Sequence, residues 1–88
     1  MKRIIASPDA PAAIGPYSQA VEINGTLYVS GQLPVNPVSG TIPEGIEAQT
    51  RQSLDNIMAI LKQAGMGPDN VAKTCVLLQH ISDFAAMN

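Results

Sequence analysis

Apolar and polar residues alternate on both sides of an Asn24-Gly25 step, which gives the clearest local pattern in the chain. Asn-Gly is the preferred pair for a two-residue turn that needs positive φ twice, so the pattern predicts a β-hairpin. In this register Gln19 pairs with Ser30 across the two strands. The alternation then divides the hairpin between two faces: Tyr17, Gln19, Val21, Tyr28, Ser30 and Gln32 on one, and Ala20, Leu27, Val29 and Gly31 on the other.

A second periodicity, with apolar residues three and four positions apart, runs through the middle of the chain. It predicts an amphipathic helix over residues 44–64, with Gly65 at its C-terminal end. Residues 2–6 are predicted to form a short edge strand. Residues 71–79 are rich in β-branched and apolar types and are predicted to form a strand covered on both faces. Strand, helix and strand would together make a right-handed βαβ-like unit.

The last residues have the pattern of another helix start, with Ser82 as its N-cap and Asp83 in its first turn. Only six residues follow Ser82, whereas isolated helices shorter than about 12 residues are marginal in water. The sequence is therefore expected to stop inside a helix. Residues 1–88 would then be a single domain that is incomplete at its C-terminus.

Composition narrows the classes of function. The chain of 88 residues has a formal net charge of −2, two tyrosines and one phenylalanine, which argues against a basic or stacking surface for nucleic acids. Its one cysteine excludes an intrachain disulfide framework and a multi-thiolate metal site. No apolar run approaches the roughly 20 residues of a membrane span, and residues 1–8 do not resemble a secretory signal. The expected location is the cytoplasm, where a lone thiol stays reduced.

Two hydroxyl side chains and a glycine gather at the open end of the predicted hairpin. Tyr17 begins one strand, and Ser30-Gly31 ends the strand beside it. Glycine there lets a ligand or a neighbouring chain approach the backbone closely, and the hydroxyls can orient it. The same residues also fit a plain strand end with a bulge glycine and a packed tyrosine, so both interpretations stay open. Cys75 lies in the buried strand pattern with Lys73 as its one cationic neighbour, which is typical of a structural small hydrophobe. His80 has no second His or Cys at metal-ligand spacing, which favours a surface or capping role.

Several segments resemble the YjgF/RidA family of reactive-intermediate deaminases, once called the L-PSP endoribonuclease family. They follow one another in the family's order and at similar spacings, and they extend across essentially the whole chain. The matching segments are Ala12-Ala13-Ile14-Gly15-Pro16-Tyr17-Ser18-Gln19-Ala20, Val29-Ser30-Gly31-Gln32-Leu33-Pro34, Gln49-Thr50-Arg51-Gln52-Ser53-Leu54-Asp55-Asn56-Ile57, and Val71-Ala72-Lys73-Thr74 with Asp83-Phe84 and Asn88.

The resemblance implies an α+β fold of the chorismate-mutase-like type, in which a mixed β-sheet carries two helices packed on one face. It implies a homotrimer with clefts between subunits. It also implies hydrolysis of enamines and imines, such as 2-aminoacrylate and 2-iminopropanoate, to 2-keto acids and ammonia, without a cofactor or a metal. Carried over residue by residue, it assigns Tyr17, Ser30, Gly31 and Asn88 to the cleft that binds a small 2-imino or enamine acid.

Part of the family site is expected to lie beyond residue 88. Family members continue there through the rest of the second helix and the C-terminal strands. That segment carries an arginine that clamps the substrate carboxylate, a cysteine, and a glutamate near the attacking water. Arg3 and Arg51 do not replace the arginine, and no catalytic residue is assigned. The alternatives to a deaminase are a non-catalytic trimeric module that binds small acids and an inactive truncated family member.

Overall fold

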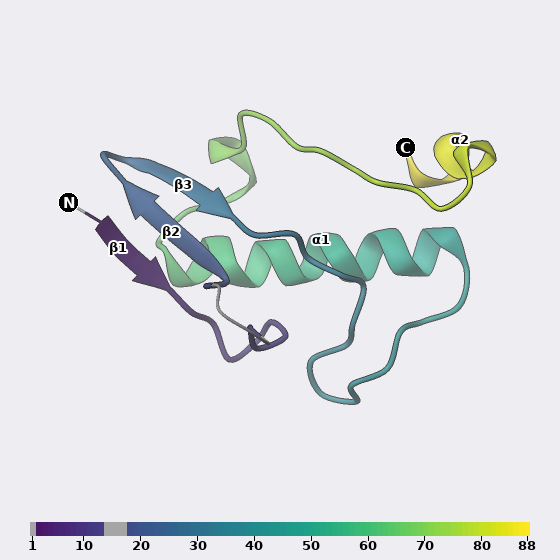
Figure 1. Cartoon of the computed structure of the whole chain (residues 1–88), viewed down its shortest axis with the longest axis horizontal. Coiled ribbons are helices and arrows are strands. Elements are labelled where there is room, and N and C mark those ends of the chain that lie inside the picture. Colours follow the sequence, from purple (N-terminus) through teal and green to yellow (C-terminus); the bar gives the residue numbers. More distant parts are fainter. Residues whose placement is uncertain (1, 14–17) are drawn as a thin grey trace.

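The computed structural model describes residues 2–13 and 18–88, which form an antiparallel sheet with one long helix across one of its faces (Figure 1). The sheet has three strands in the order β1-β2-β3. This arrangement confirms the predicted α+β class. The elements are β1 (Lys2–Ile5), β2 (Ala20–Ile23), β3 (Thr26–Val29), α1 (Ile46–Gln63), the 3-10 turns η1 (Pro68–Asn70) and η2 (Ile81–Asp83), and α2 (Phe84–Met87).

The hairpin of β2 and β3 has the predicted turn and register. Asn24 and Gly25 have φ values of 51° and 82°, the left-handed conformations that a type I′ turn requires. The strands pair antiparallel from Ala20↔Val29 to Ile23↔Thr26. The main-chain N–H of Ser30 donates to the carbonyl of Gln19 at 2.9 Å, so the pairing continues one step beyond β2 and β3. The Asn-Gly signal was therefore sufficient to predict both the turn and the facing residues.

The core lies between the sheet and α1. Ile5 of β1, Ala20 of β2 and Ile60 of α1 are buried together with Ala10, and Leu27 and Val29 of β3 pack against them. Ala20, Leu27 and Val29 share one face of the hairpin, as the alternation predicted. On the opposite face of the three strands, Ile4, Ile23 and Tyr28 are exposed and Val21 is half-buried. One face of this small sheet is thus packed on the helix and the other is uncovered.

The C-terminal end of α1 is closed by hydrogen bonds beyond the helix. Gly65 has a φ of 77°, and its N–H donates to the carbonyl of Lys62 at 3.0 Å. The N–H of Met66 donates to the carbonyl of Leu61 at 2.8 Å. Together these bonds make the Schellman arrangement that glycine permits at a helix end. The predicted helix over residues 44–64 is confirmed within two residues at each end.

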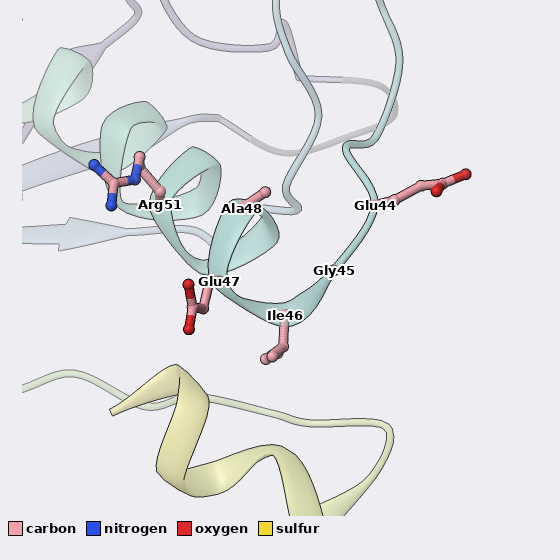
Figure 2. Close-up of a pocket in the computed structure, with 6 residues that line it drawn as sticks. All are labelled: Glu44, Gly45, Ile46, Glu47, Ala48 and Arg51. Carbon is pink, nitrogen blue, oxygen red and sulfur yellow. The ribbon is translucent and has the colours of Figure 1, made fainter.

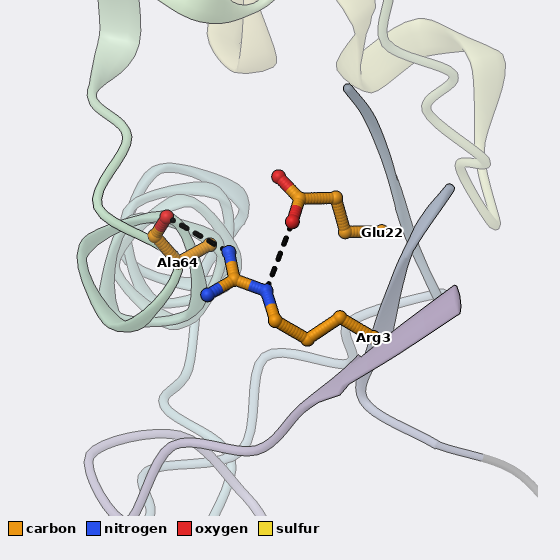
Figure 3. A network of polar contacts seen from close by, with 3 residues as sticks. All are labelled: Arg3, Glu22 and Ala64. Carbon is orange, nitrogen blue, oxygen red and sulfur yellow. Dashed lines mark hydrogen bonds and ion pairs between the residues drawn. The ribbon is translucent and has the colours of Figure 1, made fainter. Parts of the chain in front are cut away.

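Arg3 joins the first strand to the end of this helix (Figure 3). Its Nε lies 2.9 Å from Oε1 of Glu22 on the neighbouring strand. One of its terminal nitrogens, Nη2, donates to the carbonyl of Ala64 at 3.4 Å. A cation beside the last carbonyls of a helix is favourable because these groups carry the negative end of the helix dipole. Arg3 therefore connects β1, β2 and the C-terminal end of α1.

The strand predicted over residues 71–79 is not formed. These residues run as an irregular segment between η1 and η2, and all of them except Leu78 are exposed (Figure 1). A strand needs a neighbour to pair its N–H and C=O groups, and the described sheet ends at β1 and β3. This sheet is accordingly wholly antiparallel, and it contains no parallel crossover of the kind expected in a mixed sheet.

The helix start predicted at Ser82 is displaced. Ser82 lies inside η2, and α2 begins at Phe84 with Asp83 as its N-cap and no side-chain capping bond. The four-residue α2 packs against α1. A short helix makes few hydrogen bonds of its own, so its position depends on this packing.

Candidate functional site

Ser30 and Gly31 lie at the open end of the hairpin, next to the start of β2. The Ser30 Oγ donates to the carbonyl of Ser18 at 2.6 Å. The main chain of Ser30 is bonded to Gln19, as described above. Gly31 is exposed, and a Cβ added to it would meet no atom within 4 Å. Ser30 is therefore fixed to the facing strand, while Gly31 leaves free space at the surface.

Tyr17 belongs to the predicted site but lies in residues 14–17, outside the described part of the chain. The described chain stops at Ala13 and resumes at Ser18. The pairing of Gln19 with Ser30 is the last step of the predicted register that the structure describes. The placement of Tyr17 opposite Gln32 stays a prediction.

An open hollow of about 690 Å³ lies beside the start of β2. Among the described residues that line it, none carries a charge, and the polar side chains belong to Ser7, Ser18 and Gln19. Such a lining can offer hydroxyl, amide and main-chain groups to a small polar molecule, but no cation to hold a carboxylate. The lining consists of Ile4, Ile5, Ala6, Ser7, Pro8, Ala10, Pro11, Ala12, Ala13, Ser18, Gln19 and Pro37.

Gln19 is the most highly connected side chain of this hollow, and sequence reasoning missed its role. Its side-chain Oε1 accepts the N–H of Ser7. Its Nε2 lies 2.7 Å from the carbonyl of Pro11, 3.2 Å from that of Ser7 and 3.4 Å from that of Ala10. Alternation grouped Gln19 with the side chains of the uncovered face, whereas Gln19 lies just before β2 and its side chain is buried. The sequence signal for a buried role was that Gln19 is a polar residue beside the small and apolar residues of the matched motif.

Asn56 makes a similar connection on the other side of Gly31. This buried residue of α1 donates through Nδ2 to the carbonyls of Leu33 and Val35, each at 3.0 Å. Its Oδ1 accepts from Gln52 at 2.9 Å. The buried side-chain amide of Asn56 therefore ties the segment that follows Gly31 to α1. Both its oxygen and its nitrogen have hydrogen-bond partners, as buried polar atoms require.

Asn88 is not brought to Ser30 and Gly31 within the single chain. It follows α2, which packs against α1, and Figure 1 shows the C-terminus beside the N-terminal half of α1, apart from the end of β3. The main-chain N–H of Asn88 donates to the carbonyl of Phe84 at 2.8 Å. The four predicted site residues thus divide into an adjacent pair, Ser30 and Gly31, a distant Asn88, and Tyr17 outside the described residues.

A second hollow, of about 560 Å³, lies at the start of α1. Figure 2 shows its residues, with Ile46 and Glu47 directed toward the side where α2 lies. The lining brings Glu44, Glu47 and Arg51 into one shallow surface. These side chains are exposed and carry charges of both signs, so they favour neither an anionic nor a cationic ligand. This hollow therefore supports no function by itself.

Two other kinds of site are not found in residues 2–13 and 18–88. No three His, Cys, Asp or Glu side chains come together there as metal ligands would. No helix in these ranges has both the length and the apolar character needed to cross a bilayer. Cys75 is an exposed free thiol, and His80 is exposed at the start of η2.

Comparison with known proteins agrees with the geometry. The family described as Endoribonuclease L-PSP matches residues 7–88. A RutC family protein of Pasteurella multocida is 51% identical over 88 residues, which are 100% of this chain and 68% of that protein. The 2-iminobutanoate/2-iminopropanoate deaminase of Escherichia coli is 47% identical over 88 residues, covering 100% of this chain and 69% of the enzyme.

The fold also matches a solved structure. The crystal structure of YyfA, a Yersinia pestis protein of the conserved Rid family, superimposes with a TM-score of 0.95 at 48% identity, covering 99% of this chain and 70% of that one. The core of sheet and helix is therefore the arrangement found in that protein. The sequence motifs, the family match and the shared fold agree, and the chain belongs to the YjgF/RidA family, the family described as Endoribonuclease L-PSP.

Proposed function

We propose that this chain acts in the hydrolysis of reactive enamines and imines of small 2-amino acids to 2-keto acids and ammonia. The observation that carries the proposal is the 47% identity, over the whole chain, to the Escherichia coli 2-iminobutanoate/2-iminopropanoate deaminase. The net charge of −2 and the single histidine favour this activity over the RNA cleavage that the family's description names.

The chemistry requires a bound carboxylate, a water that adds to the C=N carbon, and proton transfer to the leaving nitrogen. We assign substrate orientation to Tyr17, Ser30, Gly31 and Asn88, which offer hydroxyl, main-chain and amide groups. Ser30 supports this assignment because its hydroxyl is bonded to Ser18, which lines the hollow beside β2. The resemblance assigns the carboxylate clamp and the glutamate to the part of longer family members that follows the matched residues.

A coupled assay tests the deaminase proposal. A serine dehydratase generates 2-aminoacrylate from serine, and pyruvate formation is followed with and without the protein. We expect little acceleration from the 88-residue chain alone. We expect a deamination step about 100-fold faster from a chimera that joins the remainder of the Escherichia coli deaminase after Asn88, since one positioned proton-transfer group contributes at least about this factor.

The matched control is the same chimera with Ser30→Ala and Gly31→Val, which keeps the added segment and alters only the proposed cleft. Equal rates for the two chimeras would show that the added segment acts without this chain's residues and would contradict the proposal. Binding of a 2-keto acid without acceleration by either chimera would instead favour the non-catalytic small-acid-binding module.

We further propose that the chain assembles as a homotrimer with clefts between subunits. The support is the uncovered face of the sheet, where Ile4, Ile23 and Tyr28 are exposed beside the half-buried Val21. A contiguous apolar sheet face is typical of an interaction surface. An interface between subunits would also add buried surface to a chain whose small size leaves it marginally stable. Asn88 and Gly31, apart in one chain, could then contribute to one cleft from different subunits.

Tyr28→Lys is expected to prevent this assembly. Tyr28 is 63% exposed in the single chain, so lysine costs the fold little, but a buried charge in the assembled sheet face would be strongly unfavourable. Light scattering after gel filtration should give a trimer for the unaltered protein and a monomer for the variant. Val38→Lys is the control, because Val38 is 95% exposed and lies in a loop away from the sheet. A monomeric unaltered protein, or a trimeric Tyr28→Lys variant, would contradict the proposed interface.

The expected site of action is the cytoplasm. Cys75 is the chain's one cysteine and its thiol is free and exposed, a state that reducing compartments maintain. Fractionation of the source cells, followed by immunodetection, checks this expectation.

A further inference from the structure

The side chain of Gln19, the residue just before β2, occupies an unusual position for an amide. It is only 4% exposed. Its one acceptor and two N–H donors are all directed at main-chain groups of residues 7–11, as the four hydrogen bonds above show. A carboxamide suits this place because it presents an acceptor and donors from one planar group.

These bonds connect the two walls of the hollow. One wall is the loop of residues 7–11, and the other is the start of β2 with Ser18 and Gln19. The main chain of Gln19 also accepts the N–H of Ser30, and Ser18 accepts the Ser30 hydroxyl. The same short segment therefore holds the loop through a side chain and holds Ser30 through its carbonyls.

We propose that Gln19 is a positioning residue of the cleft, fixing the loop of residues 7–11 and the end of the hairpin relative to each other so that Ser30 keeps its place. Gln19 acts through its neighbours and does not itself need to touch the substrate. The kinetic part of this inference rests on the proposed deaminase function.

The packing of the loop explains why the amide matters. Within residues 7–11, Ser7 and Ala10 are buried, whereas Pro8 and Asp9 are exposed. Few apolar contacts hold the outer part of the loop, so the hydrogen bonds to Gln19 determine where it lies. Without them, the carbonyls of Ser7, Ala10 and Pro11 lose the partner that holds them toward the start of β2, and the loop is free to move outward. Such a movement would open the hollow.

Two substitutions separate this role from general stability. Gln19→Met keeps the approximate volume but removes every polar bond. Gln19→Glu keeps the shape but, when ionised, places a carboxylate against the carbonyls of Ala10 and Pro11. Burial raises the pKa of such a carboxyl, and its protonated form can again donate one bond. Ile60→Val is the control, since it loosens the core cluster to which Ala10 of the loop belongs but removes none of the hydrogen bonds between the loop and Gln19.

Steady-state kinetics of the active chimera give the first readout. We expect KM to rise about tenfold in Gln19→Met at every pH, with a smaller change in kcat, because the binding wall is displaced. In Gln19→Glu the same rise should be present at about pH 8 and largely reversed at about pH 5, relative to the unaltered enzyme. If Gln19→Met does not fold, the pH dependence of Gln19→Glu decides alone. A KM no higher than that of Ile60→Val, or the same KM elevation of Gln19→Glu at both pH values, would overturn the proposal.

Hydrogen exchange gives a readout that needs no substrate. The N–H of Ser30 is bonded to the main chain of Gln19, so its protection does not depend directly on the Gln19 side chain. Loss of Ser30 protection in Gln19→Met, with protection kept in Ile60→Val, supports positioning. Equal protection in the two variants overturns it. If the unaltered chimera shows no deamination, the proposed function fails, and the exchange experiment still decides the role of Gln19.

Discussion

Replacing Ile60 with alanine should lower the free energy of unfolding by about 2–5 kcal/mol. Ile60 is 0% exposed and lies at the centre of the buried cluster with Ile5, Ala10 and Ala20. Removing three of its carbon atoms leaves a cavity between α1 and the sheet that these small neighbours cannot fill. A domain of this size has only about 5–15 kcal/mol of stability in total, so the variant should be close to unfolding.

Urea denaturation followed by circular dichroism measures this effect. Ile60→Val is the graded control and should cost about 0.5–1.5 kcal/mol, because it removes a single methyl group. The losses of unfolding free energy in Ile60→Ala and Ile60→Val should differ clearly, while the dependence of this free energy on urea concentration stays the same. Similar midpoints for Ile60→Ala and the unaltered protein would show that α1 does not pack on the sheet as described.

Replacing Gly31 with alanine should reduce kcat/KM of the active chimera about 10- to 100-fold while leaving its stability unchanged. In the single chain a Cβ on Gly31 meets nothing within 4 Å, and Gly31 does not have a positive φ, so the chain itself tolerates the methyl group. The expected loss comes from a ligand or a neighbouring subunit that approaches the backbone at this point. Coupled kinetics and thermal melting of the same sample separate the two effects.

Gly67→Ala is the matched control for this experiment. Gly67 also has open space at its Cβ position and an extended backbone, with φ −142° and ψ −175°, but it lies beyond α1 and away from the hairpin. It should change neither activity nor melting temperature. Full activity of Gly31→Ala would indicate that Gly31 is a plain strand-end glycine, the alternative that the sequence left open.

The elements that could be predicted are those determined by local chemistry. Asn24-Gly25 predicted the hairpin because few other pairs of neighbouring residues both adopt positive φ. The apolar period of α1 and the glycine after it predicted the helix and its end. Both signals act over a few residues, so they did not depend on the rest of the molecule.

The features that could not be predicted depend on distant partners. The segment 71–79 has strand-like residues, but strand formation requires a neighbouring strand, which the composition of the segment does not supply. Gln19 and Asn56 are polar residues that became buried because carbonyls of other loops reach them. For the site, alternation correctly placed Ser30 opposite Gln19, whereas the assignment of Asn88 came from the family resemblance alone.

The contact of Arg3 with Ala64 has a consequence for the order of folding. These residues are 61 positions apart in the sequence, whereas the two strands of the hairpin are joined by a turn of only two residues. Loop-closure entropy rises by about 0.6 kcal/mol per doubling of length, which makes the longer closure about 3 kcal/mol less favourable before any contact is formed. The hairpin and α1 can form from local contacts, while β1 is expected to take its final place last.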